Sequence, residues 1–284
     1  MSKFKIYINA SIAMLAFAAN SIICRLALHN DTIDPASFTT IRLLSGAIIL
    51  VIITQLIPLN KTTIKPKQSH AWISGLILFI YAATFSFAYI NLATATGALL
   101  LFGAVQSFLI AYSLYSKEPF TIKQGIGILT AIAGLIYLFL PHLTSPSLTE
   151  AILMFLSGVA WAAYTLLGKK QGSPIKNNTD SFTKAAIISV VMSLFWLPQI
   201  HLSTLGIVLA ISSGAIASGL GYAIWYSVLP NLKASSAASI QLTVPIIAAV
   251  GGIIFLSENV DQRLIFASIA ILGGVGLSLL NKKA

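Results

Sequence analysis

Charged residues are scarce in this sequence. Asp, Glu, Lys and Arg make up 8% of its 284 residues, whereas they make up about 25% of an ordinary soluble domain. Hydrophobic residues account for 57% of the chain, and the mean hydropathy is +0.91. Because so few charges cannot cover the surface of a water-soluble protein of this length, the composition excludes that class and favours a protein embedded in a membrane.

Residues that carry chemistry are also few. Cys24 is the single cysteine, which excludes a disulfide framework and a cysteine-ligated metal site. We expect it to be a small packing residue near a helix end, open to an impermeant thiol reagent from outside. No Walker A loop, H-E-x-x-H motif, nucleophile elbow or paired His/Cys ligand set is present. We therefore expect no enzyme activity, no catalytic residues, no metal and no cofactor.

Acidic residues inside apolar segments are missing as well. All seven carboxylates lie in loops or at segment ends. A proton relay or a drug–proton exchanger needs an ionisable group within the membrane. Coupling through such a carboxylate is therefore unsupported, and a facilitator or another coupling route remains.

Long apolar runs are what the sequence has in abundance. A run of about 18 residues or more can cross a hydrocarbon core as a helix. Polar, proline-containing joints such as "HNDTIDPAS" and "KKQGSPIKNNTD" separate the runs. Ten runs meet this description, at residues 5–28, 36–57, 71–90, 94–115, 122–140, 149–168, 181–197, 204–228, 235–256 and 264–280. The sequence therefore predicts an all-α membrane protein with ten transmembrane helices.

The basic residues indicate how these helices are oriented. The net charge is +10, and a cytoplasmic N-terminus places every lysine in cytoplasmic loops, leaving only Arg25, Arg42 and Arg263 on the other side. Basic loops are retained in the cytoplasm. We therefore expect a multi-pass protein of a bacterial-type cytoplasmic (inner) membrane with both termini cytoplasmic, and no nucleic-acid partner.

The first apolar run has a second interpretation. Its basic start and A-F-A triplet resemble a cleavable signal peptide. The run continues past the triplet to Leu28, and the internal repeat described next requires it, so we interpret it as the first membrane span.

The two halves of the chain resemble each other weakly. "FAANSI" at residues 17–22 aligns with "WAAYTL" at 161–166, and "FTTIRLLSG" at 38–46 aligns with "FTKAAIISV" at 182–190. Further along, Glu118 aligns with Glu258. We predict two five-span repeats, residues 1–143 and 144–284. Because each repeat crosses the membrane an odd number of times, the second repeat is inverted relative to the first. Inverted repeats are typical of alternating-access transporters with a binding site near the midplane.

Several segments resemble a known family. They are "FAANSIICRLAL", "FTTIRLLSGAIIL", "GYAIWYSVLPNLKASSAASIQLTVPIIAAVGGIIFLSE" and "IAILGGVGLSLL". Together they resemble the drug/metabolite transporter (DMT) superfamily, specifically its ten-span EamA-type permeases, and each predicted half is an EamA-like repeat. The resemblance implies a permease, often an exporter of amino acids or related metabolites, with a central cavity. The segment "GALLLFGAVQSFL" lacks the proline that many members carry, which leaves the substrate open.

Two polar interruptions stand out within the apolar runs. Gln241 and Pro245 share one face of the 235–256 run, and the proline frees the Gln241 carbonyl from its intrahelical bond. At membrane depth such groups need protein or a watery cavity as a neighbour. Gln106 occupies nearly the equivalent place in the other half. We expect all three to line a substrate cavity; the alternative is a proline kink and an amide satisfied by neighbouring helices.

Other candidate residues are aromatic or amide side chains. Asn20 is repeat-equivalent to Tyr164, which lies beside Trp161. Tyr222 and Trp225 share a face of the 204–228 run, and Tyr81 belongs to an aromatic stripe in the 71–90 run. These positions are candidates for substrate binding, although such stripes are more often packing or interface residues.

Arg42 lies about one turn inside its predicted span. A charge there is costly unless it pairs or reaches the interface. It either pairs with Asp31 or Asp34 in the adjacent loop, which we slightly favour, or attracts an anionic group such as a carboxylate.

These features predict a permease that moves a small polar or zwitterionic metabolite by alternating access, with amino acids and export favoured. The partners are then a small-molecule substrate and the lipid bilayer; a homo-oligomer is possible and not required. The alternative is a non-transporting membrane protein, either a lipid-processing enzyme or an accessory subunit.

Overall fold

The computed structural model describes residues 2–56, 68–115, 122–139, 147–169, 174–232, 240–259 and 261–279. Within these residues the regular elements are helices, apart from one isolated bridge between Ile33 and Leu202. The all-α prediction is thereby confirmed.

The helices follow the predicted runs closely. The first half contains α1 (Lys3–His29), α2 (Pro35–Leu56), α3 (Gln68–Ala88), α4 (Thr94–Tyr115) and α5 (Ile122–Phe139). The second half contains α6 (Leu148–Lys169), α7 (Pro174–Phe195), the short η1 (Leu197–Gln199), α8 (Thr204–Ile211), η2 (Ser212–Leu220), α9 (Gly221–Val228), η3 (Leu229–Asn231), α11 (Thr243–Leu256) and α12 (Gln262–Leu279). Because α8 to η3 run on as one segment, the described residues hold ten long helical segments, as predicted.

Several of these segments are long and apolar enough to cross a membrane. Among the described residues, five meet that condition: residues 3–29, 35–56, 71–88, 148–168 and 204–231. Shorter apolar helical stretches occupy 94–109, 125–138, 243–256 and 262–277. Large apolar side chains such as Ile48, Leu129 and Phe255 are exposed. Because lipid tails are as apolar as these side chains, the exposure fits an integral membrane protein.

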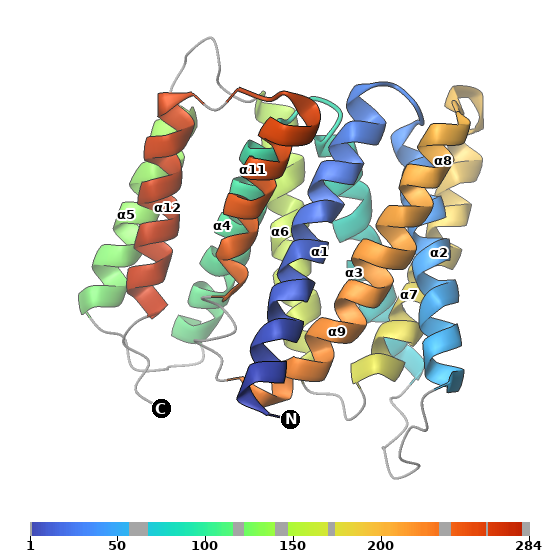
Figure 1. Ribbon diagram of the computed structural model, residues 1–284, viewed down its shortest axis with the longest axis horizontal. Coiled ribbons are helices and arrows are strands. Elements are labelled where there is room, and N and C mark those ends of the chain that lie inside the picture. Colours follow the sequence, from blue (N-terminus) through green and yellow to red (C-terminus); the bar gives the residue numbers. More distant parts are fainter. Residues whose placement is uncertain are drawn as a thin grey trace.

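The helices stand side by side in a bundle (Figure 1). The start of α1 and the end of α12 lie at the same end of the bundle, which we call the terminal end; the opposite end is called the distal end. The pair α5 and α12 forms one edge, and α2, α7 and α8 form the other. Both α1 and α6 lie in the centre of the bundle.

The helix contacts repeat when the two halves are exchanged. In the first half, α3 packs on α6 and α7, and the α8–α9 segment packs in the same way on α1 and α2. Likewise α4 packs on α6, and α11 packs on α1. The remaining strong pairs, α2 with α7, α4 with α11 and α5 with α12, join equivalent helices.

Polar caps start several helices where the sequence has its joints. Asp34 accepts the Ser37 amide at 2.9 Å ahead of α2, with Pro35 as the first helical residue. Ser203 accepts the Gly206 amide at 3.0 Å ahead of α8. Backbone bonds from Asp34 to His201 and from Ser203 to Thr32 tie the two loops together at the distal end. These bonds hold α2 against α8.

Two predicted segments begin elsewhere than expected. The run 181–197 corresponds to α7, which already starts at Pro174, so Asn177 and Asn178 lie on a helix rather than in a loop. Proline is favoured in the first helical turn because its missing N–H has no intrahelical role there. The polar residues of "IKNNTD" lower the local hydropathy, so the apolar pattern did not predict that the helix starts here.

The second difference concerns Pro245. We predicted it inside a continuous helix 235–256, but α11 starts at Thr243, after a turn at Leu242; residues 235–239 lie outside the described residues. Pro245 is therefore the third residue of a helix, where no intrahelical hydrogen bond is lost. Ile240 and Gln241 are helical as well, so within the described residues the expected continuous helix is interrupted at Leu242, between Gln241 and Pro245.

The run 204–228 contains a π-helical segment that the sequence did not predict. It is η2, nine residues long, between α8 and α9. Wide helical turns of this kind occur frequently at functional sites. Gly214 in η2 lies directly against the backbone of Arg42 and the hydroxyl of Ser45, where a Cβ atom would collide with both. The glycine therefore brings η2 close to α2 beside Arg42.

Candidate functional site

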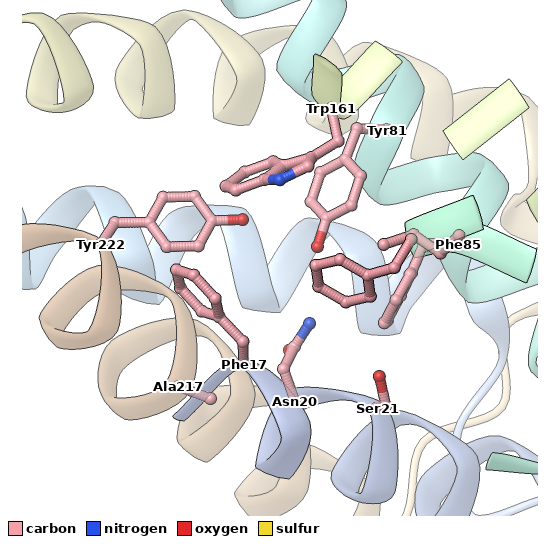
Figure 2. Close-up of a pocket in the computed structure, with 10 residues that line it drawn as sticks. Phe17, Asn20, Ser21, Tyr81, Phe85, Trp161, Ala217 and Tyr222 are labelled. Carbon is pink, nitrogen blue, oxygen red and sulfur yellow. The ribbon is translucent and has the colours of Figure 1, made fainter. Parts of the chain in front are cut away.

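A small cavity lies in the centre of the bundle, where helical segments from both halves meet (Figure 2). It is lined by Phe17, Asn20 and Ser21 of α1, Tyr81 and Phe85 of α3, Leu101 and Phe102 of α4, Trp161 of α6, Ala217 of η2 and Tyr222 of α9. Its volume is about 20 Å³, which is room for about one water molecule. We call it the central cavity. In this structure it is nearly closed.

Aromatic rings form most of the wall, and Trp161 is at their centre. Its ring centroid lies 4.9 Å from that of Tyr222 and 5.1 Å from that of Tyr81. Phe17 meets Trp161 edge to face, with the centroids 6.0 Å apart. Figure 2 shows these rings converging on one space from different helices. Offset and edge-to-face pairs are the favoured ring geometries, so these contacts stabilise the packing of the wall.

Arg42 of α2 lies directly behind this wall and is 1% exposed. Its Nε donates to the Ser218 hydroxyl of η2 at 3.2 Å, and its Nη2 donates to the Tyr81 hydroxyl at 3.2 Å. The guanidinium also lies over the rings of Phe85 and Tyr81, at 5.0 and 5.3 Å from the centroids. The cation is therefore held by hydroxyls and π faces.

Within the described part of the chain, Arg42 has no carboxylate at salt-bridge distance. Asp31 and Asp34 were the expected partners. No ion pair joins Asp31 to Arg42 among the described residues, and Asp34 uses its two oxygens for the amides of Ser37 and His201, at 2.9 and 3.1 Å. The predicted pairing with the adjacent loop is therefore wrong. Nη1 of Arg42 is buried without a hydrogen-bond partner, so the guanidinium keeps an unused donor edge.

Two further polar groups reach the central cavity. Ser213 of η2 donates to Oδ1 of Asn20 at 2.6 Å, and the Asn20 nitrogen points into the cavity (Figure 2). The Tyr222 hydroxyl is buried and has no hydrogen-bond partner. Both groups can donate to a molecule that enters. The described residues contain no group of three or more His, Cys, Asp or Glu suited to a metal ion.

The structure brings together some of the sequence candidates and separates others. Asn20, Tyr81, Trp161 and Tyr222 line the central cavity, and Trp225 supports it by an edge-to-face contact with Phe17 at 6.2 Å. Tyr164 lines a second cavity instead. Gln106, Gln241 and Pro245 are buried but do not belong to the central wall.

The distal end above the central cavity is closed by a polar cluster that the sequence reading missed. Arg25 of α1 donates through Nη1 to the carbonyls of Tyr89 and Ile90, at 3.1 and 2.6 Å. Its Nε lies 3.6 Å from Glu258, whose carboxylate accepts the Thr94 amide at 2.9 Å. We call these five residues the distal latch. From the sequence, Arg25 served only to orient the helices and Glu258 only as a repeat position.

The latch joins helices from both halves of the chain. Glu258 follows α11 and caps the N-terminus of α4, where a carboxylate also meets the positive end of the helix dipole. Ser257, in a left-handed conformation with φ 52°, ends α11 and turns the chain toward Thr94. Opening the distal end requires these contacts to break.

A protein-family model matches two segments of the chain. The model of the EamA-like transporter family matches residues 4–140 and 148–280. The chain also resembles a solved protein structure. The match covers 94% of this chain and 95% of the solved chain, with a TM-score of 0.66 at 14% identity. At that identity the likeness establishes the fold alone.

Individual relatives span nearly the same length. An uncharacterized protein of Pseudomonas aeruginosa is 45% identical over 94% of this chain and 92% of its own. An uncharacterized transporter of Archaeoglobus fulgidus is 24% identical over 96% of this chain and 97% of its own. The uncharacterized transporter YoaV of Bacillus subtilis is 20% identical over 88% of each chain.

Proposed function

Because the chain belongs to the EamA-like transporter family and is a membrane transporter, we propose that it is a permease for small zwitterionic metabolites, namely amino acids and related compounds. The observation that carries this substrate class is Arg42, a buried cation with an unused donor edge beside an aromatic cavity. The expected net direction is export.

The free-energy cost of Arg42 is the reason to assign it a ligand. A buried charge without a counter-ion costs several kcal/mol, because neither Coulomb attraction nor water compensates its desolvation. Two hydroxyls and two rings offset part of that cost. A substrate carboxylate would complete the compensation, since the planar guanidinium binds carboxylates through two parallel hydrogen bonds.

The remaining wall suits the other parts of an amino acid. Ring faces of Trp161, Tyr81 and Phe17 attract an ammonium group and accept an apolar side chain. Asn20 and the Tyr222 hydroxyl add neutral donors. With room for about one water molecule, the central cavity must widen to admit such a substrate.

Alternating access supplies that widening. The exchanged helix contacts and the two family matches support an inverted pair of five-helix repeats, residues 1–143 and 144–284. In such a pair, one end opens while the other stays closed. The distal latch is one closure, and the ring stack of Trp161 on Tyr164 and Tyr222 is the other. The charge distribution supports an inner-membrane protein with cytoplasmic termini.

Counter-flow in proteoliposomes tests this function. Vesicles loaded with an unlabelled amino-acid mixture should accumulate the same amino acids in labelled form. Arg42→Gln removes the charge while keeping two polar atoms, and we expect exchange to fall about 30- to 150-fold, which corresponds to about 2–3 kcal/mol of charge-assisted hydrogen bonding. Arg42→Lys should also be impaired, since an ammonium lacks the planar fork.

Arg263→Gln is the matched control. Arg263 donates to the Tyr137 carbonyl at 2.9 and 2.6 Å, on the α5–α12 edge, so its loss leaves the central cavity intact. Normal exchange by Arg42→Gln would refute the substrate class. Absence of exchange for every amino acid, together with turnover of a lipid, would establish the non-transporting alternative.

A further inference from the structure

A second cavity lies nearer the terminal end, where α7 begins. Its volume is about 10 Å³, so, like the central cavity, it must widen to admit more than a water molecule. It is lined by Asn177, Asn178 and Ser181 of α7, Tyr164 of α6, Tyr226 of α9 and Ser74 of α3, beside Gly168. We call it the terminal cavity. Unlike the central cavity, its lining contains hydroxyl and amide side chains on every helix that contributes to it.

Two amide groups in this cavity are buried donors without a partner. Asn177 is 8% exposed and Asn178 is 3% exposed, and the Nδ2 atom of each has no hydrogen-bond partner. The Tyr164 hydroxyl donates to Oδ1 of Asn178 at 2.5 Å. This bond fixes the amide so that its NH₂ group is the free side. An unsatisfied buried donor destabilises a protein, so two of them in one cavity call for a ligand.

The free groups define the chemistry of that ligand. Amide N–H groups bind oxygen acceptors, and an ionised acceptor makes bonds roughly twice as strong as a neutral one. No lining residue is charged. The nearest charges on α7 are Asp180 and its two neighbours Lys176 and Lys184, which leave a net positive charge along this helix start. An anionic oxygen group therefore fits the cavity better than a cation does.

We propose that the terminal cavity is a second binding station, which takes the carboxylate of the transported molecule through Asn177 and Asn178. This assignment rests on the proposed function for the identity of the ligand. Neutral amides bind a carboxylate less tightly than Arg42 does. The station therefore holds the substrate briefly, on the terminal side of the central cavity.

The two cavities are adjacent through a pair of rings. Tyr164, which binds Asn178, lies 5.9 Å from Trp161 between centroids, and Trp161 is part of the central wall. Movement of Trp161 is therefore the step that joins the stations. A substrate carboxylate that leaves Asn178 passes Tyr164 and Trp161, enters the central cavity and then reaches Arg42.

Acetate binding to the purified chain in detergent tests the assignment without needing transport. Saturation-transfer NMR with sodium acetate as the probe, and acetamide as the neutral reference, should detect binding in the wild type. Arg42→Gln should keep part of the acetate signal. Adding Asn177→Ala and Asn178→Ala to that variant should reduce it to the acetamide level.

Thr179→Val is the matched control on the same helix. The Thr179 hydroxyl faces α2, where it lies 2.8 Å from the Thr54 hydroxyl, and acetate binding should survive its loss. Helicity and a single gel-filtration peak confirm that each variant folds. The single variants Asn177→Ala and Asn178→Ala, made in the Arg42→Gln background, should each lose part of the remaining signal.

The outcomes separate this proposal from the proposed function. If Arg42→Gln alone abolishes acetate binding, or if the alanine pair leaves the residual signal unchanged, the second station is refuted and Arg42 still stands. If the wild type exchanges no amino acid but the alanine pair removes residual acetate binding, the transport proposal fails and the terminal cavity stands as a carboxylate-binding site alone. In exchange assays, the alanine pair should raise the KM at the terminal face at least about tenfold and leave the KM at the distal face unchanged, since the charge-assisted bonds of both amides are lost on that side only.

Discussion

Replacing Glu258 by glutamine should open the distal end. The carboxylate accepts the Thr94 amide at 2.9 Å and the Thr94 hydroxyl at 3.0 Å, and it lies 3.6 Å from Nε of Arg25. The Glu258→Gln variant would keep an oxygen for the Thr94 amide but lose the charge. Because all three contacts join α4 or α1 to the end of α11, they exist only while the distal end is closed.

The size of the effect follows from these contacts. A hydrogen bond to a charged group contributes about 1 kcal/mol more than a neutral one, and two such bonds are affected. The ion pair is long, at 3.6 Å, and its side chains are only 9% and 13% exposed. Because desolvation offsets most of its Coulomb attraction, it contributes up to about 1 kcal/mol more. A loss of about 2–3 kcal/mol raises the ratio of open to closed molecules by about 30- to 150-fold.

The single cysteine reports this opening directly. Cys24 precedes Arg25 and is fully buried, so a membrane-impermeant maleimide reaches it only when the latch opens. The expected packing role near a helix end is confirmed, whereas free access from outside is not what the closed structure offers. Labelling of Glu258→Gln in right-side-out vesicles should be faster than that of the wild type by the factor above.

Glu150→Gln provides the control for this experiment. It removes a carboxylate at the same end, whose Oε1 accepts from Asn91 at 2.6 Å, without touching Arg25. An unchanged labelling rate in Glu258→Gln, or a rate increased only in inside-out vesicles, would refute the latch. Labelling of the wild type from the cytoplasmic face alone would overturn the predicted topology.

Two further predictions concern how the cavity wall is positioned. Gly214→Ala should lower the thermal midpoint, since the new Cβ would lie 2.8 Å from the Arg42 carbonyl carbon and overpacking costs about 1–3 kcal/mol. Gly276→Ala should leave it unchanged because that Cβ meets nothing within 4 Å; equal midpoints for both variants would contradict the close approach of η2 to α2. Asp34→Ala should destabilise by about 1–2 kcal/mol through loss of the α2 cap, measured by thermal unfolding, and should leave acetate binding intact. Loss of acetate binding there would mean that Asp34 does act through Arg42.

The candidate site was accessible from the sequence only in part. Asn20, Tyr81, Trp161 and Tyr222 reach one cavity because α1, α3, α6 and α9 each turn one of these side chains toward it. Repeat alignment and aromatic spacing selected these four residues as candidates, whereas their role in substrate binding stays a prediction. Gln241 shows the limit of that method. Helical spacing grouped it with Pro245, but the helix is interrupted at Leu242, between the two residues.

Sequence patterns could not predict the contacts between distant parts of the chain. Arg42 meets Ser218 across a π-helical segment, and Asn178 was assigned to a loop because it stands among polar letters. The latch joins residues from α1, the α3–α4 connection and the end of α11. None of these pairs has a local sequence signal.

The sequence by itself determined that this is a helical membrane protein, how many helical segments it has and which family it resembles. Apolar length and composition suffice for that, since the bilayer selects helices by their average hydropathy whatever their neighbours are. Only the tertiary structure decided that Arg42 lacks a counter-ion among the described residues, that η2 widens beside it and that two unsatisfied amides share a cavity. The physical reason is that a buried polar group is defined by the atoms around it, and helix packing brings those atoms from residues far away along the chain.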